Sequence, residues 1–434
     1  MDYHLPHLYK DYGTYSNYRN FPLDLDGLKP VERRVLLSAY KIARNNFVKS
    51  RQVDAYTIGH YHPHGECYGT IVQLVRQGFL TGQGNFGTNV GVEPVGPAAP
   101  RYTECRISKQ SLDMIFKYIK HAPMVDTELG DKEPLYLPTM FPVCLMGNEY
   151  TQGIGFGFKT FIPCYDLRDL HQRLLWLLGI RKRKPIIKPL TNCTITSPPD
   201  IVESLLTTGK AKIDVTGVFE ANVRNNTVVL KSWPPGKRFE SFLNKFSVEL
   251  DSGMIGFTDL SVSQTEIVFQ VLRERNRDKI FKEFIIKLKS AIKGTLSFEN
   301  VLVDSNQKVI VKSVDDMLID TYNMFWTVNE QMLKHEINKV KELVSEYHIL
   351  EKIKAPLAKC IGEGRDINFS LKVIKNKTGI DEKTSGMLIE KYKIRKLLTL
   401  NTDTTDLEDK GKVFSNTLQN LTDFILEQYN EIIK

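Results

Sequence analysis

The chain has 434 residues, of which 41% are hydrophobic and 25% are charged, values that are ordinary for a globular protein with several domains. Lysine and arginine exceed aspartate and glutamate by 59 to 51, and the resulting charge of +8 allows a polyanionic partner without requiring one. No apolar run approaches the roughly 20 residues that span a bilayer, and the N-terminus lacks signal-peptide order, which argues against a membrane-spanning protein and a secreted one. Six scattered cysteines without a Cys-x-x-Cys pair argue against a zinc site and disulfides and predict a cytoplasmic location.

The first clear element is a helix predicted from Lys29 to Phe47. Pro30 suits its first turn, and apolar residues recur at helical spacing along its length. Arg33 and Arg34 fall on the remaining faces. The pattern alone favours a core helix with a solvated basic side.

Two short helices are predicted next, separated by the segment Gly59–Gly65. The second runs from about Glu66 to Gln77, and helix, short turn and helix is the plan of a helix-turn-helix. A glycine-rich run, Gly78–Gly96, then interrupts regular structure. The pair Arg101–Tyr102 is therefore expected on a loop or strand held by these helices.

From about Pro134 to Asp320 the pattern indicates an α/β layer with its own core. A hairpin is predicted there because two β-rich runs flank a turn at positions 224–226. The predicted strands cover residues 215–223, 227–233 and 265–272, and the predicted helices cover residues 237–246 and 278–292.

The remaining sequence is helical. Two apolar runs step by three and four residues, the seam spacing of a coiled coil, although each spans only about two heptads and an ordinary bundle helix stays an alternative. A compact insert is predicted between them, from Pro356 to Lys396. The two seams consist of Leu333, Ile337, Val340, Val344 and Tyr347, and of Phe414, Leu418, Leu421 and Ile425.

Four motifs stand in fixed order within the first quarter of the chain. An Arg-Tyr pair alone carries little information among 18 tyrosines, but the ordered set resembles the DNA breakage-reunion subunit of type IIA topoisomerases. That family includes gyrase A, topoisomerase IV A and the medium subunit of T4-like phage topoisomerases, which the chain resembles especially. The motifs are DGLKPVERR at 26–34, YHPHG at 61–65, GQGNFG at 82–87 and AAPRYTECR at 98–106.

The resemblance implies that Tyr102 is the nucleophile that attacks a DNA phosphodiester. A tyrosine hydroxyl ionises only near pH 10, so such an attack needs removal of the phenol proton and positive charge near the phosphate oxygens. Arg101 can supply that charge with fixed bidentate geometry, and other groups must complete the site.

The resemblance also assigns DNA-binding residues. Ile154 matches an isoleucine that unstacks base pairs as a wedge, and basic side chains would hold phosphates. For His62 and His64 the sequence leaves two alternatives, a metal site and a cap on the following helix. The assigned DNA-binding residues are Arg19, Lys29, Arg33, Arg34, His62, His64 and Ile154.

The implied fold is mixed α/β and multi-domain. An N-terminal arm and winged-helix (helix-turn-helix) domain would cover residues 1–133, an α/β tower domain 134–320, and a long antiparallel coiled coil with a C-terminal dimer gate 321–434. The chain ends where bacterial A subunits continue into a DNA-wrapping domain, so relaxation and decatenation are expected rather than negative supercoiling.

The resemblance implies double-stranded DNA as substrate, a homodimer, and a separate ATPase/TOPRIM subunit that binds Mg²⁺ and ATP. This sequence offers no recognisable acidic metal-binding module and no phosphate-cradling loop, so it is expected to bind DNA alone but not to cleave it efficiently. Two other readings compete: a non-catalytic DNA-bending architectural protein, and a tyrosine recombinase, whose Arg-His-Arg set does not match. Glu32 departs from the family, which usually has His or Gln there.

Overall fold

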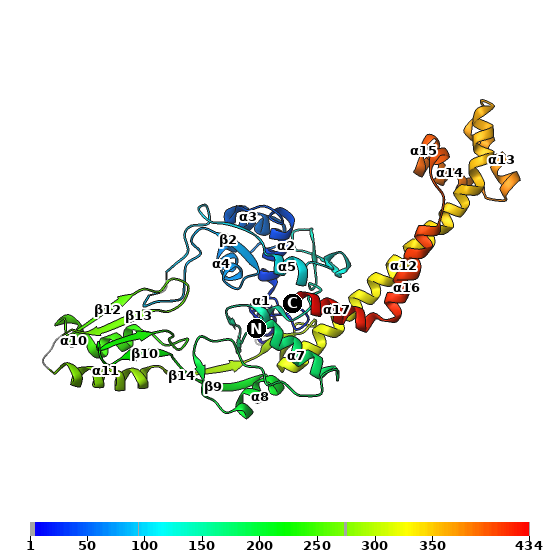
Figure 1. Cartoon of the computed structure of the whole chain (residues 1–434). Helices are drawn as coiled ribbons and strands as arrows, with labels where there is room; N and C mark the ends of the chain where they lie inside the picture. Colours follow the sequence, from blue (N-terminus) through cyan, green and yellow to red (C-terminus); the bar gives the residue numbers. More distant parts are fainter. Residues whose placement is uncertain (1–4, 94, 273–275, 434) are drawn as a thin grey trace. The chain divides into compact units, whose positions relative to one another are not determined.

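The computed structural model describes residues 5–93, 95–272 and 276–433, and it is mixed α/β throughout (Figure 1). The chain forms two compact units, one extending to Phe325 and including Tyr429 onward, the other covering Trp326–Gln428. The expected mixed α/β, multi-domain class with a long helix is confirmed. None of the described helices is long and apolar enough to cross a lipid bilayer.

Three helices and a three-stranded antiparallel sheet follow the N-terminal helix α1 (Leu5–Asn20). The predicted helix 29–47 is shorter in the structure because Ala43 leaves helical geometry and its carbonyl accepts a hydrogen bond from Ile107 N at 3.0 Å. The helices are α2 (Pro30–Ile42), α3 (Ser50–His60) and α4 (Tyr68–Arg76), and the sheet has the order β1 (Val48–Lys49), β3 (Glu104–Ile107), β2 (Leu80–Gln83).

A five-stranded antiparallel sheet forms the next layer, with α7 (Leu167–Leu177) and α8 (Pro199–Thr208) beside it in sequence. Val202 and Leu205 of α8 pack with Ile213, Leu296 and Phe298 of the sheet in one buried cluster. The strand order is β6 (Thr151–Ile154), β7 (Lys159–Ile162), β14 (Lys293–Glu299), β9 (Lys210–Thr216), β8 (Thr194–Ile195).

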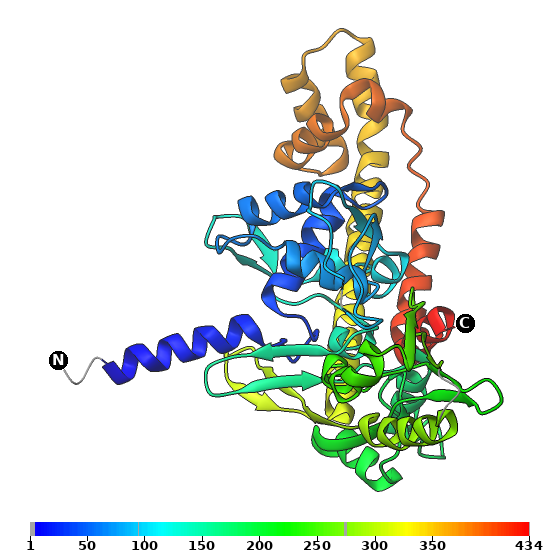
Figure 2. The ribbon, with the colours of Figure 1, turned by 90° about the vertical axis from the view of Figure 1, so that its left-hand side faces the viewer.

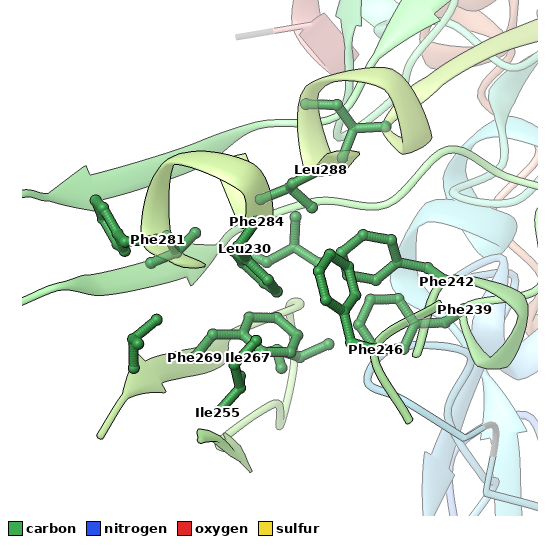
Figure 3. Packing of buried hydrophobic residues seen from close by; sticks show 13 residues of the cluster. Leu230, Phe239, Phe242, Phe246, Ile255, Ile267, Phe269, Phe281, Phe284 and Leu288 are labelled. Carbon is green, nitrogen blue, oxygen red and sulfur yellow. The ribbon is translucent and has the colours of Figure 1, made fainter. Parts of the chain in front are cut away.

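A four-stranded antiparallel sheet carries a phenylalanine-rich core under α11 (Arg277–Ala291), where Phe242, Phe246, Phe269 and Phe284 point toward one another (Figure 3). Such aromatic clusters bury a large apolar area per residue. The strands of this four-stranded sheet are β10 (Phe219–Asn222), β11 (Thr227–Leu230), β13 (Ile267–Val271) and β12 (Ile255–Asp259), in that order.

The predicted hairpin is confirmed between β10 and β11, whose register pairs Phe219 with Leu230, and the predicted strand 265–272 and helix 278–292 are confirmed as β13 and α11. The strand predicted at 215–223 was wrong as a single strand. Val215 belongs to β9 in the five-stranded sheet, where it pairs with Gly294 of β14. The chain leaves that sheet at Gly217, whose N donates to Ile292 O at 2.8 Å.

The helix predicted at 237–246 is broken into α9 (Glu240–Leu243) and a 3₁₀ turn (Asn244–Phe246). Tightening the last turn buries Phe246 in the phenylalanine core together with Phe242. The other short elements are α5 (Lys109–Met114), a 3₁₀ turn (Ile119–His121), β4 (Met124–Asp126), β5 (Lys132–Pro134), α6 (Val143–Met146), α10 (Ser247–Asp251), β15 (Val301–Val303) and β16 (Val309–Val311).

The second unit is helical. From Trp326 onward the 49-residue helix α12 (Val314–Gly362) supplies its first arm, and α16 (Thr405–Gln419) runs back beside it (Figure 1 and Figure 2). The helices α13 (Ile367–Thr378), α14 (Glu382–Tyr392) and α15 (Ile394–Thr399) form the insert, and α17 (Leu421–Ile433) ends the chain.

Two helical predictions need correction. Pro356 does not begin the insert but lies inside α12, where burial of Ile353 and Leu357 against the insert offsets the backbone hydrogen bond that proline cannot donate. The second predicted seam is not one helix. It breaks at Asn420, whose main-chain N–H and side-chain amide both donate to Asn416 O, at 3.1 Å each.

Candidate active site

The loop that carries Arg101 and Tyr102 is pinned to the start of α3. Ser50 N donates to Thr103 O at 2.9 Å, and Arg51 N donates to Pro100 O at 3.2 Å. The first N–H groups of a helix have no partner within the helix, so the loop carbonyls satisfy them. The position of the loop is therefore fixed by backbone geometry.

Side chains beneath the loop hold it from the other side. The Tyr68 hydroxyl donates to Ala98 O at 2.6 Å and lies 3.1 Å from Thr103 Oγ1, and the buried Thr103 hydroxyl donates to Ser50 Oγ at 2.8 Å. The segment leading to Tyr102 is thus anchored by a small polar network, which the motif sequence alone does not reveal.

Tyr102 itself is 65% exposed, just before strand β3. The Arg101 guanidinium carbon lies 4.7 Å from the centroid of the Tyr102 ring, in the range of a cation–π contact. An exposed phenol beside a permanent cation, on a rigidly held loop, can approach a phosphate group from solvent.

The glycine-rich run before the loop folds back on itself and contacts the four-stranded sheet, which is far away in sequence. Thr88 and Val95 pair across it, and Val92 N donates to Asp259 Oδ2 at 2.7 Å at the end of β12. The Val92 side chain packs against the phenylalanine core. The sequence predicted only irregular structure here, because glycines give no sign of such an anchor.

His62 and His64 lie together at the turn after α3. Their ring centroids are 5.2 Å apart, the Tyr15 hydroxyl of α1 lies 2.8 Å from His64 Nε2, and Arg34 Nη1 donates to His62 Nδ1 at 3.3 Å. An arginine can only donate, so the proton of a neutral His62 ring sits on Nε2.

Of the two alternatives left open for these histidines, the helix cap does not hold. Neither histidine caps α4. Asp54 of α3 accepts from Cys67 N, the residue before α4, at 2.7 Å instead. Across the part of the chain that the structure describes, no three histidine, cysteine or acidic side chains are grouped so that they could hold a metal ion.

Burial, reinforced by the charge of Arg34, lowers the pKa of His62 to about 4. We expect the free energy of unfolding to decrease as the pH is lowered from about 6.5 to about 4. In that window His62 of the unfolded chain binds a proton that the folded chain excludes. His62→Asn should flatten this part of the curve of melting temperature against pH, measured by scanning calorimetry. His335→Asn, at an exposed position of α12, should leave the curve unchanged, and parallel curves for wild type and His62→Asn would contradict the prediction.

The two neighbouring arginines of α2 have different surroundings. Arg34 forms a bidentate pair with Glu133, both distances being 2.8 Å, and still reaches His62. Arg33 is only 4% exposed, and it donates to the two Asp26 carboxylate oxygens at 2.7 and 2.9 Å. The expectation that Arg33 grips DNA phosphates is therefore corrected: its guanidinium is used inside the core.

Lys29 and Glu32 have local roles that the motif did not specify. Lys29 Nζ donates to Gln152 O of β6 at 2.5 Å. Glu32 faces the interior, where it accepts from Lys29 N at 2.9 Å, and burial raises the pKa of its carboxyl. The unexpected carboxylate thus secures the start of α2 instead of facing solvent.

Ile154 ends strand β6 and is 81% exposed, opposite Lys159 of β7. The adjacent glycines are required by close packing. A Cβ on Gly153 would lie 2.2 Å from Asn20 O, and one on Gly155 would lie 2.2 Å from Asn17 Oδ1. An apolar side chain is therefore presented to solvent by a hairpin fitted against α1.

The contacts of several predicted residues divide them into two groups. Tyr15, His64, His62 and Arg34 form a continuous chain of contacts from α1 to α2, with Arg19 over the Tyr15 ring at 5.5 Å. Within the described ranges, no hydrogen bond or ring contact joins that chain to Arg101 or Tyr102. Sequence reasoning missed Tyr15 and Asn17, and only the helical register of α1 could have indicated them.

Comparison with known proteins agrees with this architecture. A family model that describes the A subunit of DNA gyrase/topoisomerase IV matches residues 19–434. This match, together with the α/β layers and the tyrosine loop that carries the motif, places the chain in a class of proteins, the A-type chains of type IIA topoisomerases. The protein belongs to the family of DNA gyrase/topoisomerase IV A subunits.

Individual relatives are moderately similar. The DNA gyrase A subunit of Neisseria gonorrhoeae is 38% identical over 174 residues, 37% of this chain and 18% of the relative. The DNA gyrase A subunit of Clostridium acetobutylicum is 24% identical over 96% of this chain and 52% of the relative. The topoisomerase subunit TopoM of Mycolicibacterium smegmatis is 27% identical over 93% of this chain and 56% of the relative. The chain spans about half or less of the length of these relatives.

Proposed function

We propose that this chain is the DNA-cleaving and rejoining subunit of an ATP-dependent type II DNA topoisomerase. The observation that carries the proposal is the exposed phenol of Tyr102 beside Arg101, on a loop that the start of α3 holds in place. Membership of the family of DNA gyrase/topoisomerase IV A subunits supports the same activity.

In the proposed reaction the Tyr102 oxygen attacks a DNA phosphorus and loses its proton, while the bond from phosphorus to the 3′ oxygen breaks. The leaving oxygen takes up a proton, and the 5′ end stays linked to the tyrosine. Arg101 would stabilise charge on the phosphate oxygens. Because one phosphate ester replaces another, the reverse reaction reseals the strand without an external source of energy.

We assign DNA contacts to every member of the predicted set except Arg33. His62 would act as a neutral hydrogen-bond donor through Nε2, because burial keeps its pKa near 4. Arg33 is left out of the set because it is buried with Asp26. The set comprises Arg19, Lys29, Arg34, His62, His64 and, as an apolar wedge between base pairs, Ile154.

Mg²⁺ and ATP are assigned to a separate ATPase/TOPRIM subunit. The described residues do not fit a metal, because they hold no cluster of three potential ligands. A divalent cation on the partner would supply stabilisation of the leaving 3′ oxygen.

The remaining assignments follow from the same proposal. The helices α2 to α4 with their sheet would form the winged-helix domain within 1–133, the two larger sheets the tower domain within 134–320, and the helical remainder the coiled coil and dimer gate within 321–434. The active species would be a homodimer with two partner subunits in the cytoplasm, where six free, buried cysteines stay reduced. The special likeness to the T4-like phage subunit stays a prediction.

The test is to trap the covalent intermediate. The full chain is combined with a gyrase B-type subunit, Mg²⁺ and circular DNA, the reaction is stopped with denaturant, and the DNA end that carries protein is mapped. Protein on 5′ ends of a staggered double-strand break is expected. A 3′ link would favour a recombinase, and DNA bending without any adduct would favour an architectural protein; either result overturns the proposal.

A further inference from the structure

We propose that Asn17 of α1 is a positioning residue that braces the β6–β7 hairpin, so that Ile154 can bend DNA. This inference rests on the proposed wedge role of Ile154. Asn17 touches neither the reacting tyrosine nor the polar network beneath it in the described structure, and it acts through the hairpin.

The brace consists of two hydrogen bonds to one residue. Phe156 N donates to Asn17 Oδ1 at 2.7 Å, and Asn17 Nδ2 donates to Phe156 O at 3.3 Å. One side-chain amide thus satisfies both polar groups of one backbone residue in the turn. Asn17 is only 5% exposed, so water does not easily replace these bonds.

Packing makes the fit between α1 and the hairpin specific. The Phe156 ring stands edge-on to Tyr12, with ring centroids 6.1 Å apart. A Cβ on Gly13 would lie 2.9 Å from Phe156 Cδ1, and one on Gly155 would lie 2.7 Å from Phe21 Cζ. The helix and the turn therefore approach each other as closely as two glycines allow, which leaves little room for the hairpin to tilt.

Ile154 sits between two anchored points of the hairpin. On one side Lys29 Nζ donates to Gln152 O at 2.5 Å, and on the other side Asn17 holds Phe156. The Ile154 side chain is exposed, so it gains little support from its own packing. Unstacking a base step costs a few kcal/mol, and this cost favours expulsion of the inserted side chain. The backbone on both sides of that side chain therefore has to be fixed.

The experiment measures DNA bending by the full chain assembled with its B-type partner. A short duplex with a dye at each end reports the ratio of bent to straight DNA among bound molecules by energy transfer. Asn17→Ala should lower that ratio roughly tenfold, from the loss of two hydrogen bonds. Asn17→Asp keeps one accepting oxygen but turns a second acceptor toward Phe156 O, so it should lower the ratio as well.

Two variants calibrate the result. Ile154→Ala removes the wedge and sets the full loss of bending. Asn20→Ala is the matched control, because Asn20 lies on the same helix and, within the described structure, its side chain donates to Ser16 O at 2.8 Å and not to the hairpin. Asn20→Ala should bend DNA like the wild type. Hydrogen exchange without DNA should show faster exchange of the 151–162 hairpin in Asn17→Ala than in Asn20→Ala.

The outcomes separate the two proposals. If Ile154→Ala bends DNA normally, the wedge role is wrong. If Ile154→Ala loses bending but Asn17→Ala and Asn17→Asp do not, the wedge stands and the brace is overturned. If Asn17→Ala proves unstable, Asn17→Asp decides, and wild-type bending with wild-type hairpin exchange in that variant counts against the brace.

Discussion

Replacing Tyr102 by phenylalanine is expected to abolish DNA cleavage by the reconstituted enzyme and to leave DNA binding unchanged. The substitution removes only the oxygen that would bond to phosphorus, and no other exposed group can take its place at the same point of the loop. Loss of a covalent nucleophile lowers turnover by about 10³-fold or more. Covalent adducts, trapped with denaturant and counted on gels, give the readout.

The structure explains why this variant should stay folded. Tyr102 is 65% exposed, and its ring keeps the contact with Arg101 when the hydroxyl is lost. Tyr12→Phe is a suitable control, because that tyrosine is also exposed and meets Phe156 through its ring. Cleavage should persist in the control. Adducts that persist at wild-type levels in Tyr102→Phe would refute the assignment of the nucleophile.

Arg101→Lys separates charge from geometry at the same site. Lysine keeps the positive charge but loses the planar fork that matches phosphate oxygens. Adduct formation by this variant is expected to lie between those of the wild type and Tyr102→Phe.

Much of the candidate site could be predicted from short motifs, because the residues concerned are close in sequence. The exposure of Tyr102 could be predicted because a glycine-rich run and a proline precede it in the sequence, and both favour a loop. The contrast between Arg33 and Arg34 could not be predicted. Neighbours on a helix point about 100° apart, so one of the two can face inward, but which one depends on where Asp26 lies.

The fold shows the same limit. Periodicity correctly located β11, β13 and α11, whose patterns are local. It joined Val215 to β10, because the passage of the chain from one sheet to another leaves no trace in the alternation of residues. It also placed the start of the insert at Pro356, because the burial that stabilises α12 beyond the proline comes from residues distant in sequence. Asn17 was missed since its partner, Phe156, is 139 residues away.

The largest effect on stability is expected from Asp26→Ala. Asp26 is fully buried, and its carboxylate accepts from Arg33 and from two backbone groups, Leu28 N at 3.0 Å and Leu137 N at 2.9 Å. Removing one partner of a buried pair leaves an uncompensated charge, which typically costs about 3–5 kcal/mol. Denaturant unfolding should therefore show a loss of that order.

A double variant tests whether the unpaired charge is the cause. If the buried guanidinium accounts for most of the loss, Asp26→Ala combined with Arg33→Met should be more stable than Asp26→Ala alone, because the charge is gone and the methionine still fills the space. Lys49→Ala is the surface control, since the Lys49–Glu104 pair at 2.7 Å is partly exposed and should contribute less than about 1 kcal/mol. A double variant no more stable than Asp26→Ala would shift the cause to the backbone groups of Leu28 and Leu137.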